Sequence, residues 1–130
     1  MTPLYHIVIP IPPVPWQRAG RSGKRTFDTP RNRDHKLHLQ WAARINRVQR
    51  IEAPDPVILR VCVVLQRPKR ERAWPTAQRD GDADNYAKML LDAWNGIVWD
   101  DDAQVVECTV RKRWAEQGES PKWEIEIGTP

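Results

Sequence analysis

An almost unbroken apolar run from Val57 to Leu65 constrains the fold of this 130-residue chain more than any other feature. Its sequence, VILRVCVVL, is rich in β-branched residues, and Arg60 is its one charged residue. A strand with one face in water would alternate between apolar and polar residues, and this run does not. The run therefore predicts a strand that is covered on both faces.

Two helices are predicted around this strand. Thr29 followed by Pro30 is typical of an N-cap with proline in the first helical position, and the helix should end near Ile51. The second helix should cover Asn85 to Trp94, because Asn95-Gly96 supplies a left-handed stop. The first helix should bury a set of apolar residues that recur at helical spacing: Leu37, Trp41, Ile45 and Val48.

The remaining segments complete an α+β fold. Leu4 to Pro10 is a short apolar strand, and residues 106–110 and 123–127 alternate as half-buried antiparallel strands do. Between the first strand and the first helix, Trp16 to Phe27 should be a mobile basic loop. We expect one domain over residues 1–130, with a mixed β-sheet of four or five strands and two main helices.

Charge divides the chain into two unlike halves. Residues 1–79 hold 16 of the 21 Lys and Arg against 5 Asp and Glu, whereas residues 80–130 hold 5 basic and 12 acidic residues. A basic surface beside an acidic cluster suits a protein that grips a polyanion and also holds divalent cations, although an unevenly charged, solvated surface would have the same composition. No apolar stretch is long enough for a membrane span, and no signal peptide is evident, so a cytoplasmic location is expected.

Three aspartates at alternate positions, Asp80, Asp82 and Asp84, form the densest acidic cluster. In an extended segment they would point to one side, where a hard cation such as Mg²⁺ would neutralise them. The spacing also opens a calcium-binding EF-hand loop, but the sixth position is Asn85 instead of Gly, and the twelfth is Leu91 instead of Glu. The EF-hand interpretation therefore fails.

A lysine and a second acidic group follow. Asp84, Lys88 and Asp92 are four residues apart and share one helix face, a spacing that also suits a plain surface ion-pair ladder. Residues 100–102 are all aspartates. If the fold brings this turn back to the start of the second helix, carboxylates, metal ions and an ammonium would meet, which are the groups that phosphodiester hydrolysis requires.

Three motifs carry a resemblance to a known family. They read DADNYAK from Asp82 to Lys88, DAWNG from Asp92 to Gly96, and DDAQV from Asp101 to Val105. Together they resemble the signature of the RusA family of Holliday junction resolvases. The resemblance extends to the amino-terminal segment, with Pro13-Val14-Pro15 before Arg18, and to the Thr29-Pro30 helix start.

The resemblance implies a homodimeric, magnesium-dependent endodeoxyribonuclease, with manganese expected to substitute. Such enzymes place paired, symmetric nicks in four-way DNA junctions and are often encoded by phages or prophages of bacterial hosts. By position, Asp82, Asp84 and Asp102 match the family's catalytic, metal-binding aspartates, and Lys88 matches its essential lysine. Asp101 and Asp80 are further candidate ligands, and Asp100 is an extra acid outside the pattern.

The candidate DNA-binding residues are basic residues of the two loops: Arg18, Arg21, Lys24, Arg25, Arg67, Lys69, Arg70 and Arg72. Trp16 suits stacking on an unpaired base or packing against its own proline run.

Two other functions remain open at this stage. One is a branched-DNA-binding module without catalysis, which leaves the acidic cluster unexplained. The other is a metal-dependent nuclease that acts on flaps, RNA or other nucleic-acid structures.

Overall fold

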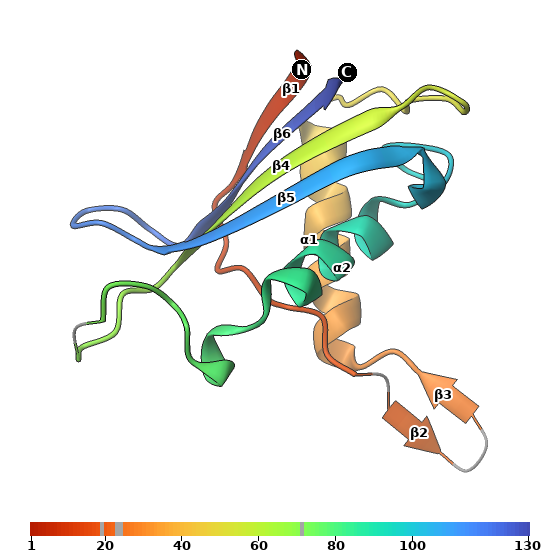
Figure 1. Ribbon diagram of the computed structural model, residues 1–130. Coiled ribbons are helices and arrows are strands. Elements are labelled where there is room, and N and C mark those ends of the chain that lie inside the picture. The colour runs from red at the N-terminus through yellow and green to blue at the C-terminus, as the bar shows by residue number, and fades with distance from the viewer. Residues whose placement is uncertain (19, 23–24, 71) are drawn as a thin grey trace.

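Four strands form a mixed β-sheet, and both long helices cover the same face of it (Figure 1). The computed structural model describes residues 1–18, 20–22, 25–70 and 72–130. In sheet order the strands are β1 (Thr2–Ile9), β6 (Lys122–Thr129), β4 (Val57–Leu65) and β5 (Val105–Trp114). The helices are α1 (Pro30–Ile45) and α2 (Ala83–Trp94), and the 3-10 turns η1 (Gln78–Asp80) and η2 (Asp102–Gln104) precede and follow α2. The architecture is the α+β fold that the sequence predicts.

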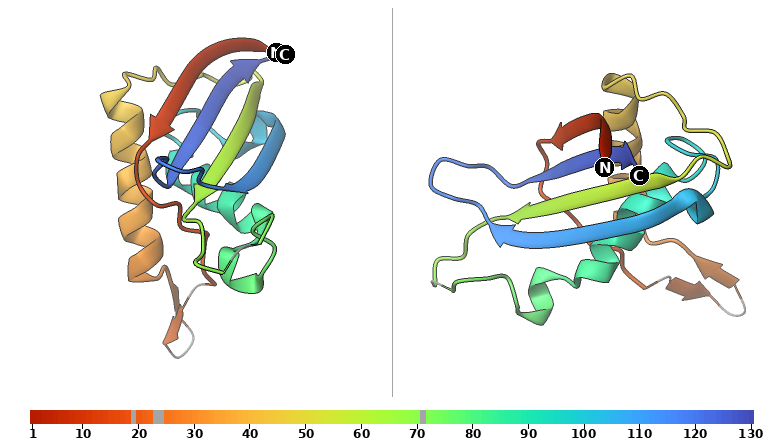
Figure 2. Two further views of the ribbon diagram at one scale, coloured as in Figure 1. Left: turned by 90° about the vertical axis from the view of Figure 1, so that its left-hand side faces the viewer. Right: turned by 45° about the horizontal axis from the view of Figure 1, so that its top comes forward.

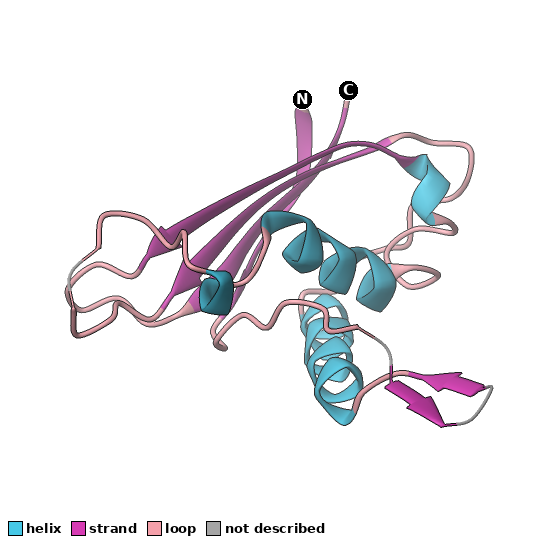
Figure 3. Cartoon of the chain, turned by 60° about the horizontal axis from the view of Figure 1, so that its bottom comes forward, coloured by secondary structure: helices cyan, strands magenta, loops and turns pink. Residues whose placement is uncertain are grey.

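The apolar run forms β4, an inner strand that lies between β6 and β5. Its helix-facing side chains, among them Leu59 and Val63, are completely buried. The other face is buried at Ile58 and Val64 but open at Arg60, which is exposed. The predicted cover on both faces is therefore incomplete, because both helices lie on one side of the sheet (Figure 3).

The direction of β5 differs from the prediction. β6 runs antiparallel to both of its neighbours, as expected, whereas β5 runs parallel to β4. The chain reaches β5 from β4 through α2, and a helical crossover of this kind joins parallel strands. Alternation of apolar residues identified the strand but carries no information about its direction.

α1 starts at the predicted residue and ends earlier than predicted. The Thr29 hydroxyl accepts a hydrogen bond from the Asn32 backbone N–H at 3.1 Å, and Pro30 is the first helical residue. The helix ends at Ile45 instead of near Ile51, because Arg47 adopts a left-handed conformation with φ of 53°.

The buried face of α1 was predicted wrongly. Leu37, Trp41 and Ile45 are each more than 60% exposed. The buried residues of α1 are instead two polar residues, one leucine and two alanines: Asn32, His35, Leu39, Ala42 and Ala43. Asn32 and His35 are buried because the segment between β1 and the hairpin hydrogen-bonds to them. Apolar periodicity could not reveal a helix face that is buried through polar contacts.

That segment, residues 10–17, is here called the proline strap, and it links the two helices. Gln17 and Asn32 of α1 exchange two hydrogen bonds, from the Gln17 N–H at 2.9 Å and to the Gln17 carbonyl at 2.8 Å. The Trp16 N–H donates to the Asn85 carbonyl of α2 at 3.0 Å. The strap therefore holds a fixed position on both helices.

The predicted mobile loop contains a short antiparallel hairpin of β2 (Gly20–Ser22) and β3 (Arg25–Phe27), which projects away from the sheet (Figure 2). Arg18 is exposed at its base. Lys24 lies outside the described residues, as do the side chains of Arg21 and Arg25.

Among the helices that the structure describes, none has both the length and the apolar character to cross a membrane.

His35 is the buried junction between α1, the strap and the sheet. Its Nε2 accepts hydrogen bonds from the Val14 backbone N–H at 3.3 Å and the Trp123 indole N–H at 3.1 Å. The imidazole must therefore be neutral, with its proton on Nδ1. Burial lowers the pKa of His35 from 6.5 to about 4, and the charges of His38 and Arg31 act in the same direction.

This geometry predicts acid-sensitive stability. The unfolded chain binds a proton at His35 near pH 6.5 and the folded chain only near pH 4, so the stabilisation is complete above pH 6.5 and is lost as the pH falls toward 4. The difference corresponds to about 3 kcal/mol. Urea unfolding between pH 4 and 7.5 should show this loss, and His35→Gln should flatten it. His38→Gln, at an exposed position, is the control, and an equal effect of both variants would refute the assignment.

Candidate functional site

The turn that leads into α2 is anchored by Asp80. Both of its carboxylate oxygens bond to the Arg72 guanidinium, at 2.9 and 3.3 Å, and one also accepts from the Ala77 N–H at 2.8 Å. Burial alone would raise the pKa of Asp80, but the hydrogen bonds from Arg72 and Ala77 lower it below its ordinary value. Asp80, a candidate metal ligand from the sequence, is thus engaged in holding the turn.

Gly81 makes the tight turn possible. Its φ of 85° is unfavourable for other residues, and an added Cβ would lie 2.8 Å from the Tyr86 ring. The Tyr86 hydroxyl donates to the Asp80 carbonyl at 2.7 Å, and the Lys112 ammonium donates to the Gly81 carbonyl at 2.6 Å. Burial raises the pKa of Tyr86 to about 12, with the Asp80 charge adding to it. The hydroxyl therefore stays protonated and keeps its bond to the turn.

Asp82 and Asp84 follow this turn with their carboxylates free. Asp82 is the N-cap of α2 and Asp84 lies in its first turn, and both are exposed. An N-cap aspartate usually accepts a hydrogen bond from the helix backbone, but Asp82 does not. Among the described residues, neither carboxylate has a hydrogen-bond or salt-bridge partner. The positive end of the helix dipole favours their charge, and their oxygens are suitable ligands for Mg²⁺.

Lys88 does not form the ion-pair ladder that its spacing permits. In the described part of the chain, it makes no salt bridge with Asp84 or Asp92. Its ammonium lies instead 4.2 Å from the centre of the Trp16 ring. Asp92 approaches Lys36 of α1, at 3.9 Å. The charge of Lys88 therefore remains available to a ligand.

Asp102 is held at the opposite end of α2. Its carboxylate accepts from the Trp99 indole N–H at 2.7 Å, and its backbone N–H donates to the Asn95 side chain at 3.1 Å. Burial raises the pKa of Asp102, and the charges of Asp92 and Asp101 raise it further, against the hydrogen bond from Trp99. A carboxylate in this state would gain from a neighbouring cation.

The two aspartates before Asp102 have structural partners. Asp100 pairs with the Arg50 guanidinium at 3.1 Å and accepts from the Ala53 N–H at 2.9 Å. Asp101 caps η2, because its carboxylate accepts from the Ala103 N–H at 2.9 Å. The structure thus separates the acidic residues into those that hold loops in place and those with free oxygens.

The free carboxylates are not gathered into one cluster. η1 and η2 lie beyond opposite ends of α2 (Figures 1 and 3), so the Asp102 turn packs near the end of the helix and not near its start. Asp84 and Asp92 are eight residues apart on α2, about 12 Å along its axis. Within the described residues, no three His, Cys, Asp or Glu side chains are close enough together to hold one metal ion.

The basic loop between β4 and η1 contains both free and engaged cations. Lys69 and Arg70 are exposed, and Arg67 is exposed with its Nε bonded to the Ala115 carbonyl at 3.1 Å. Arg72 bonds to Asp80 and stacks over the Trp114 ring, with 5.0 Å between the guanidinium carbon and the ring centre. Arg72 is therefore a structural residue in this structure.

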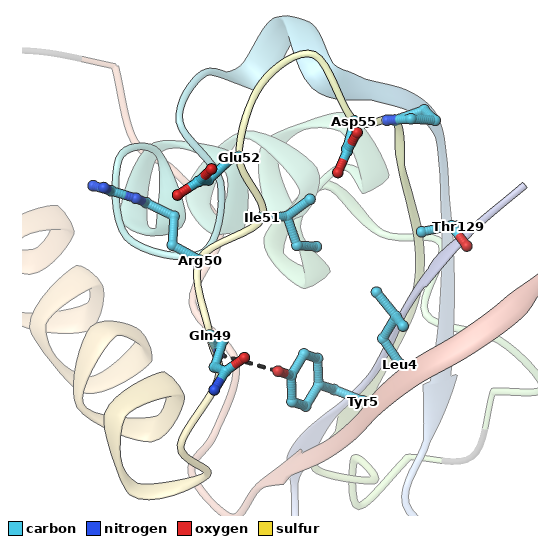
Figure 4. A pocket seen from close by; sticks show the side chains of 9 residues that line it. Leu4, Tyr5, Gln49, Arg50, Ile51, Glu52, Asp55 and Thr129 are labelled. Carbon is cyan, nitrogen blue, oxygen red and sulfur yellow. Dashed lines mark hydrogen bonds between the residues drawn. The ribbon is translucent and has the colours of Figure 1, made fainter.

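A groove of about 460 Å³ lies beside the Asp80 turn, between it and the proline strap. Arg31 and Arg79 line it, and among the described residues neither forms a salt bridge. Neither arginine was predicted as a binding residue from the sequence, because neither lies in the two basic loops. A larger hollow, of about 600 Å³, lies elsewhere, and neither Asp82 nor Asp84 lines it (Figure 4). It is closed on one side by the hydrogen bond between the Gln49 N–H and the Tyr5 hydroxyl, at 3.1 Å.

Gly81→Ala should displace the turn that presents Asp82. The left-handed backbone conformation costs about 1–3 kcal/mol for alanine, and the new methyl group would also push the Tyr86 ring. Gly118→Ala is the matched control, because Gly118 has φ of 81° with open space around it. Thermal unfolding should show a lower melting temperature for both variants than for the wild type. Any activity of the site should fall only in Gly81→Ala. Equal activity in the two variants would contradict this role for the turn.

Comparison with known proteins adds one finding. The family model described as Endodeoxyribonuclease RusA matches residues 10–128 of the chain. Among curated proteins no match is found. The matched range includes the proline strap, both helices, and every candidate acid and basic residue named above.

Proposed function

This chain belongs to the RusA endodeoxyribonuclease family, and from that premise we propose that it resolves four-way DNA junctions by paired, symmetric nicks, in a reaction that depends on a divalent metal ion. One observation carries the proposal beyond family membership. The aspartates of the family motif, Asp82 and Asp84, keep free carboxylates at the start of α2, while Asp80 next to them is fully hydrogen-bonded. Free, repelling charges on a well-anchored turn suit a cation-binding site.

The donor set suits magnesium, with manganese as a substitute. Mg²⁺ is usually held by one or two carboxylates together with waters and substrate phosphates. Asp82 and Asp84 can supply the carboxylates, and a bound DNA strand can supply the phosphate. Asp102 remains a candidate ligand from the family motif, but its turn lies at the other end of α2, so it would not share an ion with Asp82 and Asp84. When bound, the metal would supply an activated water and neutralise developing charge on the phosphate.

The residues of the chain would share the remaining tasks. Lys88 lies on α2 between the two groups of acids and forms no ion pair with any described residue, so its ammonium would stabilise the phosphate in the transition state or orient the attacking water. Trp99 and Asn95 would hold Asp102 in a defined orientation. The face of α2 from Asp84 to Asp92 would follow the strand that is cut.

DNA would be held by basic residues on either side of this face. The exposed side chains of Arg18, Lys69 and Arg70 can contact phosphates without reading sequence. Arg21, Lys24 and Arg25 of the hairpin remain candidates from the sequence. Arg31 and Arg79 would bind phosphate at the groove beside the Asp80 turn. Because these contacts are electrostatic, affinity should fall steeply with salt.

The cleavage of synthetic DNA tests the proposal. An end-labelled four-way junction and a linear duplex of the same sequence are incubated with Mg²⁺ or with a chelator. We expect paired nicks near the branch point of the junction only, and none with the chelator. Asp84→Asn should lower the cleavage rate about 100-fold or more, because it removes a ligand charge. Asp55→Asn, at an exposed aspartate away from α2, is the control.

Other results would assign another function. Tight junction binding without cleavage in Mg²⁺ or Mn²⁺ would identify a non-catalytic branched-DNA-binding module. Equal cleavage of the linear duplex, or faster cleavage of flaps or RNA, would identify a nuclease with a different substrate. Cleavage that persists in Asp84→Asn would remove the proposed metal ligands from the reaction.

We also propose that the protein acts as a homodimer through the exposed face of α1. Symmetric cuts in a junction with two-fold symmetry are most simply made by two equivalent sites. Leu37, Trp41 and Ile45 form an exposed apolar stripe at four-residue spacing, and such stripes commonly mark interfaces. Asp34 lies toward one end of the stripe and Arg44 toward the other, so an antiparallel pair of α1 helices would bring opposite charges together.

Sedimentation tests this surface. The wild-type protein should have about twice the chain mass of 15.2 kDa, and Trp41→Glu should sediment as a monomer because it buries a charge at the centre of the stripe. Trp74→Glu is the matched control, since Trp74 is also exposed but lies in the basic loop. A monomeric wild-type protein, or a Trp41→Glu variant that remains dimeric, would exclude the α1 face as the dimer surface.

A further inference from the structure

The proline strap brings an aromatic ring to the candidate catalytic lysine. The Trp16 N–H bonds to the Asn85 carbonyl at 3.0 Å, one turn before Lys88 on α2. The Trp16 side chain is half-buried and packs against the hydrophobic core. Backbone and side chain are therefore both fixed, and the ring lies with its centre 4.2 Å from the Lys88 ammonium.

A lysine in the middle of an exposed helix face normally samples many rotamers. Holding the ammonium in one place costs side-chain entropy, up to about 2 kcal/mol for a lysine. The acidic residues at four-residue spacing, Asp84 and Asp92, could hold it, but within the described part of the chain they form no ion pair with it. The indole ring is thus the contact that locates the Lys88 charge.

We propose that Trp16 is a positioning residue for Lys88, which it holds by a cation–π contact over the path of the scissile strand. The inference rests on the proposed function, because it assigns Lys88 to the cleavage step. An indole ring is the strongest cation–π partner among the side chains. Unlike a carboxylate, it accepts the charge without neutralising it, and it leaves ammonium N–H groups free to donate to a phosphate.

The same geometry opposes a role for Trp16 as a base-stacking platform. The Lys88 ammonium lies over the Trp16 ring, and the Trp16 side chain also packs against the hydrophobic core. A nucleobase would have to displace the lysine to reach that face of the ring. Stacking on DNA and positioning of Lys88 therefore predict different effects of the same substitutions.

The first test is spectroscopic and needs no cleavage. The Lys88 Cε carries the ammonium that lies over the Trp16 ring, so we expect the indole to shield the Cε protons and to shift their NMR signals upfield in the wild-type protein. Trp16→Leu should return these signals to ordinary lysine values, and Val14→Ala should not. Val14 is the matched control, because it belongs to the same strap and packs against the core, but it is not the ring over Lys88. Unshifted Lys88 signals in the wild-type protein would overturn the proposal.

The second test separates cleavage rate from DNA affinity. Single-turnover cleavage is measured with saturating enzyme, and junction affinity is measured without divalent cation. Trp16→Leu should slow cleavage roughly tenfold, as expected for loss of one cation–π contact, and should change the junction Kd less than twofold. Trp16→Phe, which keeps a ring face, should recover most of the rate. Val14→Ala should lower thermal stability and leave the rate near that of the wild type.

Three results would overturn the proposal. The first is an equal rate in wild type and Trp16→Leu, and the second is an equal loss in Trp16→Phe and Trp16→Leu. The third is a weaker junction affinity in Trp16→Leu that persists when Lys88→Met is added, because Trp16 would then contact the DNA itself. If the wild-type protein cuts no junction at all, the proposed function fails, and the NMR shifts still decide whether Trp16 holds Lys88.

Discussion

The hydrogen bonds to the Asp80 carboxylate are the interaction on which the candidate site depends. They tie the basic loop, through Arg72 and Ala77, to the residue that starts the turn into α2. Asp80 is fixed and Gly81 turns the chain. The backbone around Asp82 and Asp84 therefore keeps its conformation, although their carboxylates have no partner among the described residues. A half-buried, hydrogen-bonded carboxylate thus supports two exposed ones that have no partner among the described residues, and unpaired charge of this kind is typical of functional sites.

The wider fold places this turn at a meeting point of three elements. α2 crosses from β4 to the parallel strand β5, so its start and its end face different loops. Lys112 of β5 bonds to the Gly81 carbonyl, while the proline strap bonds to Asn85 from the other side. The strap is in turn held by α1. Charge at the site can therefore be kept exposed because the backbone around it is bonded from several directions.

Much of this fold could be predicted from the sequence, and the failures have physical causes. The apolar run of β4 and the Thr29 cap gave the correct elements, because both are local signals. The direction of β5 and the buried face of α1 depend on tertiary contacts that local periodicity does not contain. The motif matches Asp82, Asp84 and Asp102 and sets Asp80 and Asp100 apart, but it could not show that Asp80, Asp100 and Asp101 hold loops in place, because that depends on contacts with Arg72, Arg50 and backbone N–H groups. The contact of Trp16 with Lys88 spans 72 positions and has no sequence signal.

The central claim is that Asp82 and Asp84 bind a divalent cation at the start of α2. Anomalous scattering from Mn²⁺ in crystals of the protein with an uncut four-way junction tests it most directly. We expect a manganese ion bonded to the carboxylates of Asp82 and Asp84 and to a phosphate oxygen of the DNA, and no ion in Asp84→Asn crystals. Manganese bound only at Asp80, Asp100 or Asp101, or an empty position beside Asp82 in crystals of a protein that cuts junctions, would contradict it.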